Sequence, residues 1–158
     1  MGESLYHCCM AVHQHLGKLF RRRKAAHLRF GARGERLAQR LLVDLGLEVL
    51  TTNYAGPHGE IDIVARDGLI LCFVEVKSRR RVVRSRPAEA VNAEKKEHIV
   101  RTAKRYLRQI GRPSIAYRFD LVELVFSGLT VHEAYYYPGA FSSLETWREN
   151  REPNEVAF

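Results

Sequence analysis

The sequence predicts an α/β domain in which helices flank a mixed β-sheet. Three observations lead to this class: an amphipathic helix early in the chain, an apolar hairpin after it, and a second amphipathic helix before two more strands. The order of elements, αβββαββ, is typical of a sheet with helices packed on it. The 158 residues, 46% of them hydrophobic, suffice for a single domain with its own core.

The first elements follow from apolar spacing and turn residues. Apolar residues recur every three or four positions from Phe30 to Leu45, which predicts a helix, and Gly46 supplies its stop. Residues Leu47–Tyr54 are predicted to form a strand. The Gly56–Gly59 segment, which contains a proline, predicts a turn.

The next two strands are predicted to form a hairpin. Residues Glu60–Arg66 alternate between polar and apolar side chains, whereas Leu69–Val76 is almost wholly apolar. The Asp67-Gly68 pair between them is a strong signal for a two-residue turn. The apolar second strand is expected at the centre of the sheet, covered on both faces.

The remaining elements alternate again. A basic loop is predicted over Lys77–Arg86, and a helix from Pro87 to Ile110 follows it. Two further strands are predicted at Arg118–Val125 and Leu129–Tyr137.

The chain is expected to contain one domain between two extensions. Residues 28–137 form the predicted domain, and residues 138–158 form a loosely patterned tail with no assigned role. Residues 1–27 are predicted to be a basic N-terminal arm. This arm contains cysteines and histidines, but their spacing matches no zinc motif.

Composition restricts the partners and the compartment. The formal net charge of +8 favours an acidic partner, either nucleic acid or an anionic membrane surface. The sequence contains no apolar span of membrane-crossing length and no convincing signal peptide. Three cysteines, with Cys72 inside an apolar run where a buried thiol is expected, fit a reducing, cytoplasmic compartment.

The predicted hairpin brings acidic side chains together. A two-residue turn makes Arg66 face Leu69, and side chains alternate along each strand. Glu60, Asp62 and Glu75 would then share one face of the hairpin with Lys77. In that register Asp62 and Glu75 are diagonal neighbours, roughly 7–8 Å apart at the backbone.

Acids gathered on a central strand pair repel each other and resist desolvation. A divalent cation would compensate them, and Mg²⁺ or Mn²⁺ prefers such oxygen ligands. The alternative is one solvated strand face on which the lysine neutralises the acids. The apolar Leu69–Val76 run argues against that alternative, because a strand with one exposed face would alternate more.

At these residues the chain resembles the PD-(D/E)XK superfamily, which has an acid on one strand and Glu-x-Lys on the next. More closely, residues 30 to 126 resemble the UPF0102 (YraN-like) family. The matching pieces are Gly31–Glu35, Asn53, Gly59–Asp62, Phe73–Arg79, Pro87–Val91, Lys95, Ala103, Tyr106, Leu107 and Arg118–Asp120. Arg84-Ser85 departs from the Phe-Gly pair usual in that family. The resemblance implies a restriction-endonuclease-like, single-domain fold, similar to that of Holliday-junction resolvases.

The resemblance also implies roles for individual residues. Asp62, Glu75 and the Val76 carbonyl would hold a Mg²⁺ or Mn²⁺ ion, and Lys77 would orient the attacking water. Glu35 would reach the ion through water, or it is an ordinary acid in the first turn of a helix.

Four further assignments concern accessory residues. Glu60 would either join the metal site or only accept hydrogen bonds. Lys95 would contact phosphate or lie on a solvated helix face. Arg118 and Asp120 are expected to form a structural ion pair, which is favoured over a catalytic role for Asp120. The strongest predicted footprint for nucleic acid is a set of arginines, with a mobile charged loop as the alternative: Arg79, Arg80, Arg81, Arg84 and Arg86.

Together these features predict a Mg²⁺-dependent endonuclease that acts on nucleic acid, with DNA favoured over RNA. The absence of a base-reading motif favours recognition of nucleic-acid structure over recognition of sequence, and resolvase-like relatives often act as homodimers. The alternatives are a non-catalytic nucleic-acid-binding module of the same fold and a membrane-surface or protein-interaction role for the basic arm.

Overall fold

The computed structural model describes residues 30–80, 91–111 and 113–143 of the chain. The chain divides between Arg33 and Gly34, and the elements below belong to the unit Gly34–Phe158. The helical residues 30–33 are the exception, since they lie before that division. Arg81, Arg84, Arg86 and the basic arm of residues 1–27 lie outside the described residues.

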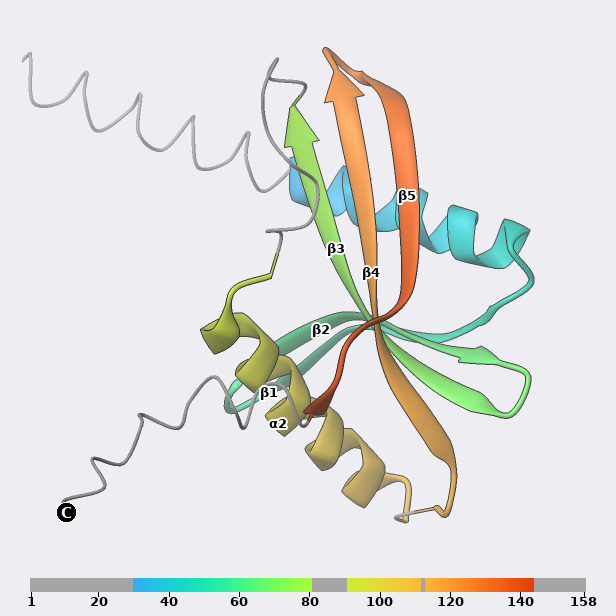
Figure 1. The fold of residues 1–158 in the computed structure, drawn as a ribbon, viewed down its shortest axis with the longest axis vertical. Helices are drawn as coiled ribbons and strands as arrows, with labels where there is room; N and C mark the ends of the chain where they lie inside the picture. Colours follow the sequence, from blue (N-terminus) through green and yellow to red (C-terminus); the bar gives the residue numbers. More distant parts are fainter. Residues whose placement is uncertain (1–29, 81–90, 112, 144–158) are drawn as a thin grey trace, which may run out of the picture. The chain divides into compact units, whose positions relative to one another are not determined.

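The described elements follow the predicted order αβββαββ (Figure 1). They are a first helix over residues 30–44, β1 (Glu48–Gly56), β2 (Gly59–Asp67), β3 (Ile70–Arg80), α2 (Ala93–Gln109), β4 (Ala116–Ser127) and β5 (Thr130–Phe141). The sheet has the strand order β1-β2-β3-β4-β5. Strands β3 and β4 are parallel, the other neighbours are antiparallel, and α2 connects the parallel pair. The α/β class with a mixed sheet of restriction-endonuclease-like type is therefore confirmed.

Helix α2 begins later than the sequence predicted. Its first residue is Ala93 rather than Pro87, and Asn92 is the N-cap. The Asn92 side chain accepts a hydrogen bond from the backbone N–H of Lys95 at 2.9 Å. An asparagine in this position satisfies a backbone donor that the first turn of a helix leaves unpaired, so it fixes the start of the helix. No helix in the described part of the chain is long and apolar enough to cross a bilayer.

All five strands are longer than predicted, and β3 and β5 extend into the segments predicted as a basic loop and a tail. Strand β3 continues to Arg80 and includes the start of the predicted basic loop, because its parallel pairing with β4 runs through Arg80 and Phe126. Strand β5 continues into the predicted tail and ends at Phe141. Phe141 is buried and stacks on Phe119 with ring centroids 5.0 Å apart, so the core holds this end of the strand.

The main core lies between α2 and one face of the sheet. Helix α2 lies along β2 and also contacts β1 (Figure 1). Its buried side chains Ile99, Val100 and Ala103 join a cluster that includes Phe73 of β3 and Phe119 of β4. Burial of this apolar surface supplies the main force that holds the helix on the sheet.

The predicted register of the central hairpin was wrong by one residue on each strand. The ladder pairs Asp67 with Ile70 and Arg66 with Leu71, so the turn is Gly68-Leu69 rather than Asp67-Gly68. Gly68 has a φ of 56°, which glycine adopts without strain. The observed turn keeps Asp67 in β2, where its carboxylate pairs with Arg118 of β4 at 2.8 Å.

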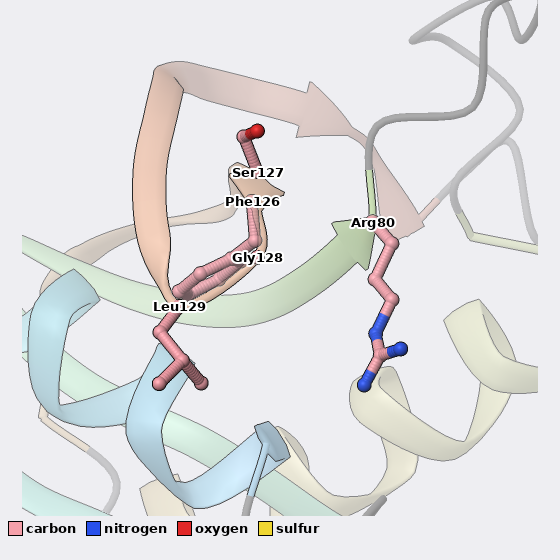
Figure 2. A pocket seen from close by; sticks show the side chains of 5 residues that line it. All are labelled: Arg80, Phe126, Ser127, Gly128 and Leu129. Carbon is pink, nitrogen blue, oxygen red and sulfur yellow. The ribbon is translucent and has the colours of Figure 1, made fainter.

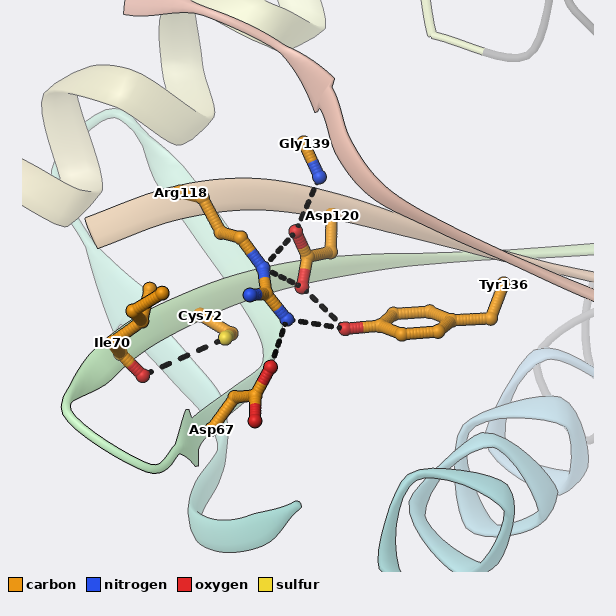
Figure 3. Close-up of polar contacts among 7 residues, drawn as sticks. All are labelled: Asp67, Ile70, Cys72, Arg118, Asp120, Tyr136 and Gly139. Atoms are coloured by element: carbon orange, nitrogen blue, oxygen red, sulfur yellow. Dashed lines mark hydrogen bonds and ion pairs between the residues drawn. The ribbon is translucent and has the colours of Figure 1, made fainter. Parts of the chain in front are cut away.

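A buried polar network joins the hairpin to β4 and β5 (Figure 3). Asp120 is fully buried and accepts hydrogen bonds from Arg118 Nε, the Tyr136 hydroxyl and the Gly139 N–H. Arg118 also donates to Asp67 and to the Tyr136 hydroxyl. The expected Arg118–Asp120 ion pair is thus confirmed, and it belongs to a larger structural cluster.

Cys72 lies beside this network, and the expectation of a buried thiol is confirmed. Its Sγ donates to the Ile70 carbonyl at 3.7 Å. Burial, followed by the negative charge of Asp120, raises the pKa of the Cys72 thiol to about 12. The thiol therefore stays protonated at neutral pH and behaves as a small core residue.

Asp120→Ala is expected to lower the free energy of unfolding by about 3–5 kcal/mol, because it leaves the Arg118 guanidinium without its buried partner. Asp67→Ala is the matched control. Asp67 is about half exposed, so its loss should cost less than about 1 kcal/mol. Urea unfolding of both variants measures the difference. Equal costs would show that the buried carboxylate does not dominate the network.

The first helix approaches β3 closely at Gly34. A Cβ atom built on Gly34 would lie 1.8 Å from Ser78 Oγ and 3.1 Å from Ser78 Cβ. Ser78 Oγ is buried and has no hydrogen-bond partner among the described residues. Glycine is therefore required here for space and not for its backbone conformation.

Gly34→Ala is expected to destabilise the protein by about 1–3 kcal/mol, because the added methyl group overlaps Ser78. Ser78→Ala alone should cost little, since its hydroxyl makes no hydrogen bond in the described structure. The cost of Gly34→Ala should shrink in a Ser78→Ala background, and a double-mutant cycle measured by thermal unfolding tests this. Additive effects of the two changes would contradict the proposed contact.

Candidate active site

The candidate site lies where the pairing between β2 and β3 ends. The last pair of the ladder is Ile63 with Val74, so Asp62 and Glu75 come one step beyond it. The observed register places these two acids on facing positions, whereas the predicted register made them diagonal. The one-residue displacement on each strand therefore brings the two acids closer.

The backbone around Asp62 is irregular. Asn53 of β1, which lies opposite Asp62 between two regular pairs, has a φ of 51°. Ile61 and Val64 are three residues apart and pack in the same hydrophobic cluster, so the strand alternation is interrupted between them. At this interruption the Asp62 side chain reaches the Val76 N–H of β3.

Asp62 is tied to β3 through its side chain. Its Oδ2 accepts a hydrogen bond from the backbone N–H of Val76 at 2.7 Å. The side chain therefore takes the place of a β2 backbone carbonyl as the acceptor for this β3 N–H, beyond the last β2–β3 pair. Asp62 is only 8% exposed, so its carboxylate is held in a largely desolvated position.

Glu75 carries the second buried carboxylate, with 3% of its surface exposed. Lys77 Nζ donates to Glu75 Oε1 at 2.7 Å, and Lys95 Nζ lies 3.1 Å from Glu75 Oε2. The second contact is an ion pair without hydrogen-bond geometry, since Oε2 has no hydrogen-bond partner among the described residues. Both lysine side chains are about 30% exposed, so they connect the buried acid to solvent.

The two acids act on each other electrostatically. Burial, and then the charge of Glu75, raises the pKa of Asp62 to about 7; the Val76 hydrogen bond and Lys95 oppose this rise. Glu35 of the first helix raises it further. Glu35 is half-buried, and it therefore belongs to the same electrostatic environment as the pair.

The donor set fits a hard divalent cation. Asp62 and Glu75 are buried, mutually repelling carboxylates, and Glu75 Oε2 accepts no hydrogen bond in the described structure. The N–H and C=O of one residue in an antiparallel strand face the same neighbour, so the Val76 carbonyl points to the Asp62 side of β3. Mg²⁺ commonly takes one or two carboxylates and keeps several waters.

Within the described ranges, no group of three or more His, Cys, Asp or Glu side chains is close enough to hold a metal ion. Glu60 in particular is exposed and pairs with Ala55 of β1. The predicted register placed Glu60 opposite Glu75, whereas the observed register moves it away from that position. Two acids and a backbone carbonyl, rather than three acids, are the candidate ligands.

The predicted arginine footprint divides into different environments. Arg79 pairs through Nε with Glu123 Oε1 at 2.9 Å, and Glu123 is a buried residue of β4. The Arg79 guanidinium therefore already forms an ion pair within the sheet. Arg80 is exposed at the end of β3.

A hollow of about 420 Å³ lies at this end of β3 (Figure 2). Figure 2 shows Arg80 on one side and Leu129 on the other, with Phe126 between them. The hollow is lined by Arg80, Phe126, Ser127, Gly128 and Leu129. Among the described residues its lining includes no acid and one cation, Arg80, so this lining does not supply the chemistry of the carboxylate pair.

Two contacts were not predicted from the sequence. Lys95 was expected to contact phosphate or solvent, yet it pairs with Glu75. Glu123 was not considered, yet it is the buried partner of Arg79. Only the acid within the apolar β4 segment could have indicated the second contact, because an acid among buried residues requires a cation.

The fold and the site define a class: an α/β protein whose mixed sheet carries a buried carboxylate pair, flanked by lysines, at the end of its central hairpin. The chain belongs to the uncharacterised protein family UPF0102, whose model matches residues 34–124. The matched range includes Asp62, Glu75, Lys77 and Lys95, so the whole carboxylate site lies within the family's common region. The resemblance noted from the sequence motifs is confirmed at the level of this family.

Individual relatives agree with this assignment. The UPF0102 protein of Chlorobaculum parvum is 39% identical over 99 residues, which cover 63% of this chain and 77% of that protein. The UPF0102 protein of Rhodococcus jostii is 42% identical over 101 residues, covering 64% of this chain and 86% of that protein. The similarity therefore extends over most of each relative.

Asp62→Asn is expected to stabilise the metal-free protein above neutral pH. The pKa of Asp62 rises from 3.8 to about 7 on folding. Its contribution to the free energy of unfolding is therefore complete below about pH 4 and is lost as the pH rises through about 7. Asparagine keeps an acceptor for the Val76 N–H but carries no charge. The free energy of unfolding of Asp62→Asn, relative to that of wild type, should grow by up to ~1.4 kcal/mol per pH unit across that window.

Urea unfolding in EDTA at several pH values measures this advantage. Glu60→Gln is the matched control, because Glu60 is an exposed acid on the same strand and its change should leave the pH dependence unaltered. Identical pH profiles for wild type and Asp62→Asn would contradict the described environment of Asp62.

Proposed function

We propose that this chain is a metal-dependent nuclease of the PD-(D/E)XK type that hydrolyses phosphodiester bonds in nucleic acid. The observation that carries the proposal is the convergence of two buried carboxylates at the end of the β2–β3 ladder, beside a lysine on the same strand. Burial of such a pair is costly unless a cation or another positive group compensates it.

Asp62, Glu75 and the Val76 carbonyl would hold the ion. When bound, Mg²⁺ or Mn²⁺ supplies Lewis acidity toward a phosphoryl oxygen and lowers the pKa of a coordinated water. The Val76 N–H bond fixes one Asp62 oxygen, which leaves the other carboxylate oxygen of Asp62 for the ion. Glu35 is near enough to act on Asp62 electrostatically and would contact the site through water.

Lys77 would serve the reacting phosphate. Its Nζ is 2.7 Å from Glu75 Oε1, and its side chain is about one-third exposed, so the ammonium lies at the border between the buried acid and solvent. From there it can hold an attacking water and offset the negative charge that develops on the phosphate. Its fixed partner limits the positions that the ammonium can adopt.

Electrostatics favour nucleic acid as the substrate. The net charge of +8 attracts a polyanion, and Arg80 and Lys95 are two of the basic residues that the structure describes. The proposal includes DNA in preference to RNA, recognition of branched or otherwise irregular structure, and action as a homodimer, as in resolvases. A cytoplasmic location is supported by the free, buried Cys72.

The test is cleavage of a panel of labelled nucleic acids: a four-way DNA junction, a flap, duplex DNA, single-stranded DNA and duplex RNA. Wild type should cleave at least one DNA in Mg²⁺ and none in EDTA. Asp62→Ala should reduce cleavage at least about a hundredfold while binding persists, because binding depends on the basic surface. Glu60→Ala is the control and should stay close to wild type.

A non-catalytic nucleic-acid-binding module is the second candidate. It is favoured by one observation, since Lys77 and Lys95 already neutralise Glu75 without a metal ion. Under this alternative, binding of the same panel would be indifferent to Mg²⁺ and to Asp62→Ala, and no substrate would be cleaved. That combination of results would refute the nuclease.

A further inference from the structure

We infer that Lys95 is a resident counter-ion of the carboxylate pair that leaves when a divalent cation binds and then contacts a phosphate of the nucleic acid. This inference rests on the proposed function, because it assumes that the pair binds a metal ion. It assigns to one residue a coupling between metal binding and nucleic-acid binding.

The first support is the position of the ammonium group. Lys95 Nζ lies 3.1 Å from Glu75 Oε2, and its charge also acts on Asp62. Lys77 is not among the charges that act strongly on Asp62, although it is hydrogen-bonded to Glu75. Lys95 therefore pairs with Glu75 and also lowers the pKa of Asp62, so its positive charge acts on both acids.

The second support is the quality of the two lysine contacts. Lys77 makes a hydrogen bond of 2.7 Å to Oε1, whereas the Lys95 contact with Oε2 lacks hydrogen-bond geometry. A non-directional ion pair is easier to replace than a hydrogen-bonded one. The carboxylate oxygen that faces Lys95 is thus the one most readily transferred to a metal ion.

The third support is the anchoring of the Lys95 backbone. Its N–H is bonded to the Asn92 cap, and α2 is held in the core by Ile99, Val100 and Ala103. Only the side chain is then free to move, and it is about 30% exposed. A lysine stem has enough rotatable bonds to turn its ammonium from the buried acids to solvent without a change in the helix.

Mutual repulsion supplies the mechanism. An ammonium group and a divalent cation cannot share the same two carboxylates without strong repulsion at this distance. Metal binding therefore releases Lys95 toward solvent, at the mouth of the site where a phosphate would lie. Linkage makes the effect reciprocal, so a phosphate that engages Lys95 strengthens metal binding.

The first experiment measures Mn²⁺ binding by isothermal titration calorimetry. Lys95→Gln should bind Mn²⁺ roughly three- to tenfold more tightly than wild type, since it removes the competing ion pair. Lys95→Arg keeps the positive charge and should bind no more tightly than wild type. Lys104→Gln is the matched control: it removes the same charge from the same helix, about 13 Å further along, and should leave Mn²⁺ affinity unchanged.

The second experiment measures the salt dependence of binding to a fluorescent duplex DNA, in EDTA and in Ca²⁺. In Ca²⁺, Lys95→Gln should reduce the slope of log affinity against log salt by about 0.9, the value for one lost phosphate contact. In EDTA its slope should equal that of wild type, because Lys95 is then paired with Glu75. Circular dichroism of each variant confirms that it is folded.

The outcomes separate the inference from the function on which it rests. Mn²⁺ binding that Asp62→Asn abolishes but Lys95→Gln leaves unchanged or weakens would overturn the role of Lys95 and keep the metal site. Equal loss of salt slope in EDTA and Ca²⁺ would overturn the release of Lys95. Absence of Mn²⁺ binding by wild type would overturn both the inference and the metal-dependent function.

Discussion

The hydrogen bond from the Val76 N–H to the Asp62 carboxylate determines how the rest of the site is arranged. It lies where β2 stops pairing with β3, and it replaces a backbone partner with a side chain. One acid is thereby fixed against the strand that carries the other, and Glu75 must remain buried beside it. The flanking lysines then become necessary, since two desolvated carboxylates are not stable side by side without positive charge.

The same requirement for neutralisation extends along β3. Glu75, Lys77 and Arg79 occupy every second position of this strand and so share one of its faces. Each is paired: Glu75 with Lys77 and Lys95, and Arg79 with Glu123 of the adjacent β4. On β4, which also carries Glu123, the buried acid Asp120 is neutralised in a comparable way by Arg118. A central parallel strand pair can therefore carry ionised groups, provided that each finds a partner within the sheet or from α2.

The sequence was sufficient for the fold class because periodicity and turn residues are local signals, and they identified every described element in order. It was insufficient for the hairpin register, since Asp67-Gly68 is the stronger local turn signal, whereas the observed turn Gly68-Leu69 keeps Asp67 in β2, where it pairs with Arg118 from a distant part of the sequence. The two acids still converged, because a displacement by one residue on each strand changes which residues face each other but not which side chains share a face of the hairpin. The pairing of Lys95 with Glu75 depends on how α2 lies on the sheet, and no local pattern encodes that.

The buried Cys72 has a consequence for studies of how the sheet opens. Its thiol is enclosed by β-strands and is held in the protonated, unreactive form by burial and by Asp120. Alkylating reagents require a thiolate that they can reach. Modification at this position must therefore wait until the centre of the sheet separates, so its rate reports local unfolding around β3 and not the chemical reactivity of the residue.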